Sequence, residues 1–158
     1  MGETLRQRLR QERFRSPQHE AMLNVLVAAA HLRERTEGAL EDRGLTAPQY
    51  NVLRILRGAQ PDGLARVEIG RRMIARSPDL TRLIDRLVRR LLVERSRSGH
   101  DRRQSRARIT RKGLQLLAEL EPAVNSVDRE LGLRLTAAEA RTLSRLCERL
   151  YGESEGDD

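Results

Sequence analysis

The chain has 158 residues, a net charge of +8 and 2% aromatic residues, and it lacks Trp. This length suits one domain with one core. Leu, Ile, Val, Ala and Met must fill that core, which favours packed helices. The single cysteine, Cys147, excludes an intrachain disulfide and agrees with a reducing compartment.

The sequence shows no pattern typical of a secretory signal peptide or a membrane-spanning helix. The N-terminus is polar and charged, unlike a secretory signal peptide, and the longest apolar run, residues 25–30, is far too short to span a membrane. We therefore expect a soluble, cytoplasmic protein with no membrane partner.

The positive charge is concentrated in one segment. Residues 71–112 contain fifteen Arg and Lys against four Asp and Glu, a net of +11, so the rest of the chain has a net charge of −3. A phosphate-binding surface requires such an asymmetry, whereas an ordinary solvated surface does not. The distribution predicts a phosphate-bearing partner, and the helix-turn-helix pattern described below makes double-stranded DNA the expected one.

The N-terminal third predicts a basic arm and one long helix. Residues 1–16 form the arm, which is either disordered or a short extra helix. Ser16 and Pro17 are typical of a helix start, and Gly44 of a helix end, so we expect a helix over residues 17–43. Residues 21–32 are apolar on nearly every face, which predicts burial against both the chain's own core and a second chain.

The middle of the chain predicts three shorter helices. Thr46 should cap a helix over residues 47–57, and a short helix should follow over residues 66–73. Ser77, as the N-cap before Pro78 and Asp79, predicts a third helix that runs to residue 90. Its apolar positions follow helical spacing, and its other face carries four arginines: Arg82, Arg86, Arg89 and Arg90.

A hairpin and two helices complete the pattern. Residues 93–97 and 105–109 predict two strands around a turn-rich tip. Thr110 should cap a helix over residues 111–133, kinked at Pro122. A capping box from Thr136 to Glu139 opens the last helix, which ends near Tyr151, and residues 152–158 form an acidic tail that we expect to be disordered.

The order of short helix, tight turn, capped basic helix and basic hairpin is that of a winged helix-turn-helix. In this fold the second helix of the pair reads the major groove, and the hairpin reaches the adjacent minor groove. We therefore expect a mainly α-helical protein with a small β-wing, about six helices and a dimeric assembly.

Three strings in this order resemble the MarR family of bacterial transcription regulators. Residues 45–56 resemble the family's second helix, residues 77–95 its recognition helix and first wing strand, and residues 100–117 its wing, return strand and next helix. The resemblance covers most of residues 20–151. It implies one domain over 17–151, in which 17–43 and 111–151 are dimerisation segments and 46–110 form the DNA-binding lobe.

The resemblance also implies roles for individual residues. In the wing, Asp101 and Arg103 match the family's Asp-x-Arg pair, where the Asp braces the wing and the Arg enters the minor groove; Arg102 is a second candidate. The recognition-helix candidates are Arg76, Ser77, Asp79, Thr81, Arg82, Arg86 and Arg89. One departure is Leu91, which stands where the family usually has Gly, so either the helix runs on or its exit is strained.

Regulation by repression and by a small-molecule effector is also implied by the resemblance alone. His31 borders the apolar stretch where family members place an effector pocket, although a half-buried structural histidine is the alternative. Two alternatives for the function stay open: a sequence-independent architectural DNA-binding protein, and a redox-responsive regulator that uses Cys147. We find no catalytic motif, metal-binding cluster or cofactor signature, so we expect no enzyme, metal or cofactor.

Overall fold

The computed structural model describes residues 2–97 and 105–152, which form seven helices and one small sheet. The helices are α1 (Glu3–Leu9), α2 (Pro17–Glu41), α3 (Ala47–Gly58), α4 (Arg66–Arg72), α5 (Leu80–Arg89), α6 (Arg111–Arg134) and α7 (Ala137–Tyr151). The strands are β1 (Leu64–Ala65), β2 (Val93–Arg97) and β3 (Ser105–Ile109), in the antiparallel order β1-β3-β2. The predicted fold class, mainly helical with a small β-wing, is confirmed.

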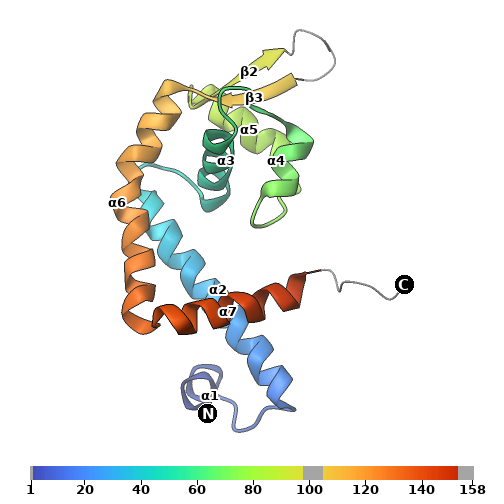
Figure 1. Ribbon diagram of the computed structural model, residues 1–158, viewed down its shortest axis with the longest axis vertical. Coiled ribbons are helices and arrows are strands. Elements are labelled where there is room, and N and C mark those ends of the chain that lie inside the picture. The colour runs from blue at the N-terminus through green and yellow to red at the C-terminus, as the bar shows by residue number, and fades with distance from the viewer. Residues whose placement is uncertain (1, 98–104, 153–158) are drawn as a thin grey trace, which may run out of the picture.

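The helices fall into two groups (Figure 1). The winged helix-turn-helix lobe contains α3, α4, α5 and the sheet, whereas α1, α7 and the first half of α2 lie at the other end of the molecule. Helix α6 runs from the sheet to α7 and joins the two groups. None of the helices in the described part of the chain could cross a membrane.

The buried core lies in the lobe and at its junction with the long helices. Leu53, Leu56, Ile69 and Leu87 are fully buried there, and α2 contributes the fully buried Leu40. Helix α6 adds Leu117 and Leu120. Hydrophobic packing therefore ties the lobe to the ends of α2 and α6 that lie nearest to it.

The other end of the molecule leaves apolar side chains uncovered. Leu26 on α2 is 58% exposed, and Leu150 on α7 is 70% exposed. Helix α7 has no buried residue at all. A single chain therefore does not bury the apolar face that residues 21–32 predict.

Local capping signals in the sequence place most helix starts correctly. Thr46 with Gln49 and Thr136 with Glu139 form full capping boxes, and Ser16 accepts a hydrogen bond from the His19 N–H at 3.1 Å. The pKa of Glu139 is lowered chiefly by its side-chain hydrogen bond to Thr136. Each box satisfies N–H groups that the first helical turn leaves without partners.

The start of α5 differs from the sequence prediction. Ser77 is not its N-cap, because the helix begins at Leu80 and its first hydrogen bond runs from the Leu83 N–H to the Asp79 carbonyl at 3.0 Å. Asp79 is therefore the cap residue, although its side chain makes no capping hydrogen bond. The position of the first buried residue, Leu80, outweighs the local Ser-Pro signal.

Three other segments refine the sequence prediction. Residues 3–9 of the arm form a helix, α1, with Leu5 buried, so the helical alternative holds for that part of the arm. Strand β1 was not predicted; it is two residues long and pairs with β3. Pro122 lies inside α6, which is continuous through it and bowed in Figure 1.

The exit from α5 is strained at Leu91. This residue has φ +60°, in the left-handed region that disfavours side chains with a Cβ. The Leu91 N–H donates to the Val88 carbonyl at 2.9 Å, and the Leu92 N–H donates to the Leu87 carbonyl at 3.0 Å. This pair of bonds is a Schellman motif, and the buried side chains of Leu87 and Leu92 supply its usual hydrophobic contact. Of the two alternatives for this exit, strain is the one that the structure adopts.

Candidate nucleic-acid interface

Helix α5 is strongly two-sided. Leu80, Leu83, Ile84 and Leu87 are buried in the core of the lobe. The opposite face carries four exposed candidates for DNA contact: Thr81, Arg82, Arg86 and Arg89. The apolar face therefore fixes the helix to the lobe and leaves three guanidinium groups exposed, where an anionic surface can meet them.

The residues before α5 lie beside this face. Arg76 is exposed, and Ser77 is half-buried in the turn that leads to the helix. Asp79 forms an exposed ion pair with Arg82 at 3.3 Å, three residues along the helix. An exposed pair of this kind is weak, so it leaves Arg82 available for another anion.

The turn between α4 and α5 is fastened from α3. The Ile74 N–H donates to Asn51 Oδ1 at 2.9 Å, across 23 residues of sequence. Sequence reasoning missed Asn51, because nothing local marks an Asn on α3 as a partner of this turn. The bond holds the chain against α3 just after α4 ends.

Arg90 does not belong to the exposed arginine face. It is the C-cap residue of α5, and its guanidinium donates to the carbonyls of Gly44 and Arg43 at 2.7 and 2.8 Å. These carbonyls lie just beyond the end of α2. Helical spacing put Arg90 on the same face as Arg82, Arg86 and Arg89, although not among the DNA-contact candidates; its guanidinium instead binds the turn after α2.

The wing is built on β2 and β3, whose register pairs Val93 with Ile109 and Arg95 with Ala107. The tip candidates Asp101, Arg102 and Arg103 lie outside the described residues. Closer to the lobe, Arg95 pairs with Asp85 of α5. This ion pair joins the wing's first strand to the recognition helix.

Two arginines of β3 hold the loop before β1. Arg106 Nη2 donates to the Gly63 carbonyl at 3.1 Å, and Arg108 Nε donates to the Asp62 carbonyl at 3.4 Å. Gly63 has φ +66°, and a Cβ there would lie 2.3 Å from the Ala107 carbonyl oxygen, so only glycine fits. Part of the predicted basic cluster therefore has structural partners within the lobe.

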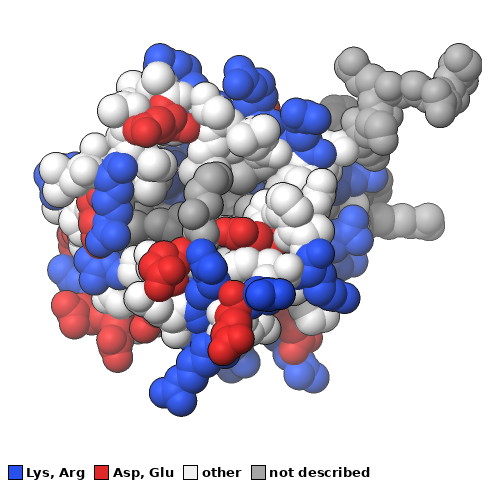
Figure 2. All heavy atoms as spheres, turned by 90° about the horizontal axis from the view of Figure 1, so that it is seen from below, with Lys and Arg blue, Asp and Glu red and all other residues white. Residues whose placement is uncertain are grey.

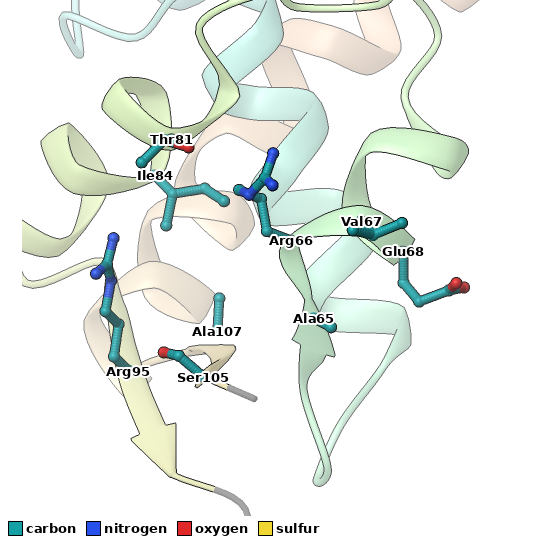
Figure 3. Close-up of a pocket in the computed structure, with 9 residues that line it drawn as sticks. All are labelled: Ala65, Arg66, Val67, Glu68, Thr81, Ile84, Arg95, Ser105 and Ala107. Atoms are coloured by element: carbon teal, nitrogen blue, oxygen red, sulfur yellow. The ribbon is translucent and has the colours of Figure 1, made fainter. Parts of the chain in front are cut away.

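A cleft of about 540 Å³ lies between α4, α5 and the sheet (Figure 3). Its walls are Thr81 and Ile84 from α5, Arg95, Ser105 and Ala107 from the wing strands, and Ala65, Arg66, Val67 and Glu68 from the β1–α4 segment. The volume is in the range of small-molecule sites. A ligand there would touch the recognition helix directly.

The hollow beside His31 is much smaller, about 60 Å³, and lies between α2 and α6. His31 itself is exposed. Arg35 donates to Glu130 at 2.7 Å, and this hydrogen bond is the main reason that the pKa of Glu130 is lowered. Arg134 also contacts Glu130, at 3.3 Å.

Charge is mixed at the end of the molecule opposite the lobe. Figure 2 views that end and shows basic and acidic side chains interspersed around white patches. Among the described residues, no three His, Cys, Asp or Glu lie together as a metal site would require. The excess of basic residues in the segment 71–112 is not repeated at the end of the molecule that Figure 2 shows.

The fold and this surface define a winged helix-turn-helix protein of the kind that regulates transcription. A family model described as "MarR family" matches residues 45–105. A "putative transcriptional regulatory protein for hcr operon" from Thauera aromatica is 32% identical over 108 residues, which cover 68% of this chain and 64% of that protein. An "HTH-type transcriptional repressor" of Mycobacterium tuberculosis is 31% identical over 121 residues, 77% of this chain and 86% of the repressor.

Solved structures of MarR proteins resemble the chain in sequence and in fold. A MarR transcription factor from Planctomyces limnophilus is 38% identical with a TM-score of 0.66, and the match covers 86% of this chain and 98% of that one. A mutant of E. coli MarR complexed with operator DNA is 26% identical with a TM-score of 0.72, covering 80% of this chain and 90% of that one. The chain belongs to the MarR family and is a transcription regulator of that family.

Proposed function

We propose that the chain is a repressor that binds pseudo-palindromic promoter DNA as a homodimer. The observation that carries this proposal is the face of α5. Three guanidinium groups, Arg82, Arg86 and Arg89, are exposed on a helix whose other face is buried. The similarity to a MarR structure complexed with operator DNA supports the same use of the corresponding helix here.

In this proposal α5 lies in the major groove, where base edges are distinguishable. Arg82 and Arg86 approach base edges, and Thr81 and Arg89 lie beside them. Arg76, Ser77 and Asp79 lie just before the helix, where Asp79 forms its weak, exposed ion pair with Arg82. In the wing, Arg103 enters the minor groove, Asp101 braces the tip, and Arg102 is the second candidate.

The dimer is proposed from the uncovered apolar surface. Residues 17–43 and 111–151 supply the dimerisation segments, and their apolar side chains Leu26, Leu146 and Leu150 are exposed in one chain. Exposed Leu side chains on both segments would be buried if these segments pack against a second chain. A two-fold dimer would place two copies of α5 about one helical turn of DNA apart. Residues 46–110 form the DNA-binding lobe of each chain.

Release of the promoter is proposed to follow small-molecule binding. The effector would favour a dimer whose two recognition helices no longer match the half-site spacing. The cleft between α4, α5 and the sheet has the volume for such a ligand, whereas the hollow at His31 would have to open. His31 stays a predicted effector contact, and substitution of residues lining either site should change the effector response.

The test is a titration against labelled DNA from upstream of the protein's own gene, near 0.15 M salt with excess random competitor. A specific regulator should retain binding on the order of a thousandfold above the competitor. If random competitor DNA displaces the protein from the labelled DNA, and also from DNA recovered by selection from random sequences, the architectural alternative is favoured. A peroxide response that Cys147→Ser abolishes would favour the redox alternative.

A further inference from the structure

The C-terminal ends of α2 and α5 meet at one side chain. Arg90 Nη1 donates to the Gly44 carbonyl at 2.7 Å, and Nη2 donates to the Arg43 carbonyl at 2.8 Å. The two acceptors lie 46 and 47 residues away in sequence, in the turn that follows α2. One guanidinium therefore bridges the recognition helix and a dimerisation helix.

Both helices end in the same way. The Gly44 N–H donates to the Glu41 carbonyl and the Leu45 N–H to the Leu40 carbonyl, with Gly44 at φ +57°. This is the Schellman pattern that Leu91 and Leu92 form at the end of α5. Helix C-terminal ends carry partial negative charge, so a cation between two of them is favourably placed.

Helix α6 also contacts the place where the ends of α2 and α5 meet. Lys112 Nζ donates to the Arg90 carbonyl at 3.1 Å, and Thr110 Oγ1 donates to the Leu91 carbonyl at 2.7 Å. The Arg43 side chain pairs with Glu119 of α6 at 3.0 Å. The ends of α2 and α5 and the first half of α6 are therefore linked by polar contacts made through Arg90 and its neighbours.

We propose that Arg90 is a positioning residue that sets the orientation of the recognition helix relative to the dimerisation helices. This inference rests on the proposed function, in which a dimer must present two copies of α5 at a fixed spacing. The planar guanidinium donates to two carbonyls at once, which a lysine ammonium does not reproduce in the same geometry. Without this fork, α5 keeps its hydrophobic packing and its polar contacts with β2 and α6 but loses its direct tie to the end of α2, and the dimer tolerates a wider range of half-site spacings.

The first test measures orientation without DNA. Spin labels are placed on α5 and α6 through Arg82→Cys and Glu121→Cys in a Cys147→Ser background, and labelled chains are diluted with unlabelled chains. Arg90→Met should broaden or shift the distance distribution, and Arg90→Lys should have a smaller effect. The matched control is Arg57→Met, which removes an exposed arginine of the same lobe that lies at the end of α3.

The second test measures the consequence on DNA. Operators are compared with one base pair added to or removed from the spacer between half-sites. The wild type and Arg57→Met should discriminate equally against the altered spacers, and Arg90→Met should narrow that discrimination by about five- to tenfold.

The outcomes separate the inference from the proposed function. If Arg90→Met lowers the melting temperature but leaves the label distances and the spacer discrimination unchanged, Arg90 is merely structural and the inference is wrong. If the wild type binds no specific DNA, the proposed function fails, and the label distances alone still decide the role of Arg90.

Discussion

The strained exit from α5 predicts an inverted order of stability at position 91. At most helical positions Gly is less stable than Ala by about 1 kcal/mol. Leu91 has φ +60°, which costs a residue with a Cβ about 1–2 kcal/mol and costs Gly nothing. Against this, Gly lowers the stability by roughly 0.4–1 kcal/mol relative to Ala, because its unfolded chain has more conformational freedom to lose. We therefore expect Leu91→Gly to be more stable than Leu91→Ala by about 0.5–1 kcal/mol.

The Ala variant is the right reference because both substitutions delete the same side chain. Leu91 is 67% exposed, so either change also loses some contact, and that loss cancels in the comparison. Leu91→Asn should fall close to Gly, since Asn tolerates the left-handed region. At the exposed helical position Gln115, the pair Gln115→Ala and Gln115→Gly should show the ordinary order, with Ala the more stable.

The assay is urea unfolding followed by helical circular dichroism, at one protein concentration because a dimer's stability depends on it. A difference of about 1 kcal/mol corresponds to roughly 3 °C in melting temperature for a chain of this size. If Leu91→Ala equals or exceeds Leu91→Gly in stability, the left-handed exit is not formed and the reasoning is refuted.

Four further predictions concern DNA binding, assembly and pH. Arg86→Ala should weaken binding to the specific site by about 1–3 kcal/mol, measured by fluorescence anisotropy; an equal loss on random DNA would make Arg86 a phosphate contact. Arg103→Ala should weaken binding and flatten any A·T preference flanking the half-sites, and unchanged affinity would contradict the wing assignment. Leu26→Glu should convert the proposed dimer to monomers in sedimentation, whereas the same substitution at the exposed lobe residue Val67 should leave the sedimentation of the wild type unchanged. The pKa of the Glu139 carboxyl is lowered in the folded chain, so its charge stabilises the fold at pH values above the unfolded pKa. The loss of stability in Glu139→Gln should therefore be largest near pH 7. It should disappear as the pH falls through the pKa of the folded state.

Local signals in the sequence were sufficient for most of the fold. Thr46 and Thr136 with their third-residue partners set two helix starts, and the β2 and β3 ranges match those expected from the alternation and turn residues. Capping and strand patterns depend on residues close together in sequence, so the local sequence is enough to predict them.

Contacts between distant segments were not predictable in the same way. Arg90 looks like a fourth arginine of the exposed face of α5, yet its partners lie on the turn after α2. Asn51 carries no sequence signal for its bond to Ile74, and β1 exists only because β3 lies beside it. Helical spacing predicts which face a residue occupies, but it does not predict which other element meets the end of the helix.

The same limit applies to the candidate site. Thr81, Arg82, Arg86 and Arg89 share the exposed face of α5, as their spacing predicts. Arg95, by contrast, is tied to Asp85, and the cleft that it lines brings together residues from 65 to 107. Volume and enclosure depend on the packing of distant segments, so the sequence could suggest an effector but could not place this cleft.

Selection from a random DNA library is the most direct test of the central claim, that two copies of α5 read sequence as a symmetric pair. Purified wild-type protein should enrich, near 0.15 M salt, a pseudo-palindrome whose half-sites lie about 10 base pairs apart. Arg86→Ala should lose information at defined positions of both half-sites. Recovery of fragments with no common motif, or of a single unpaired half-site, would contradict the account.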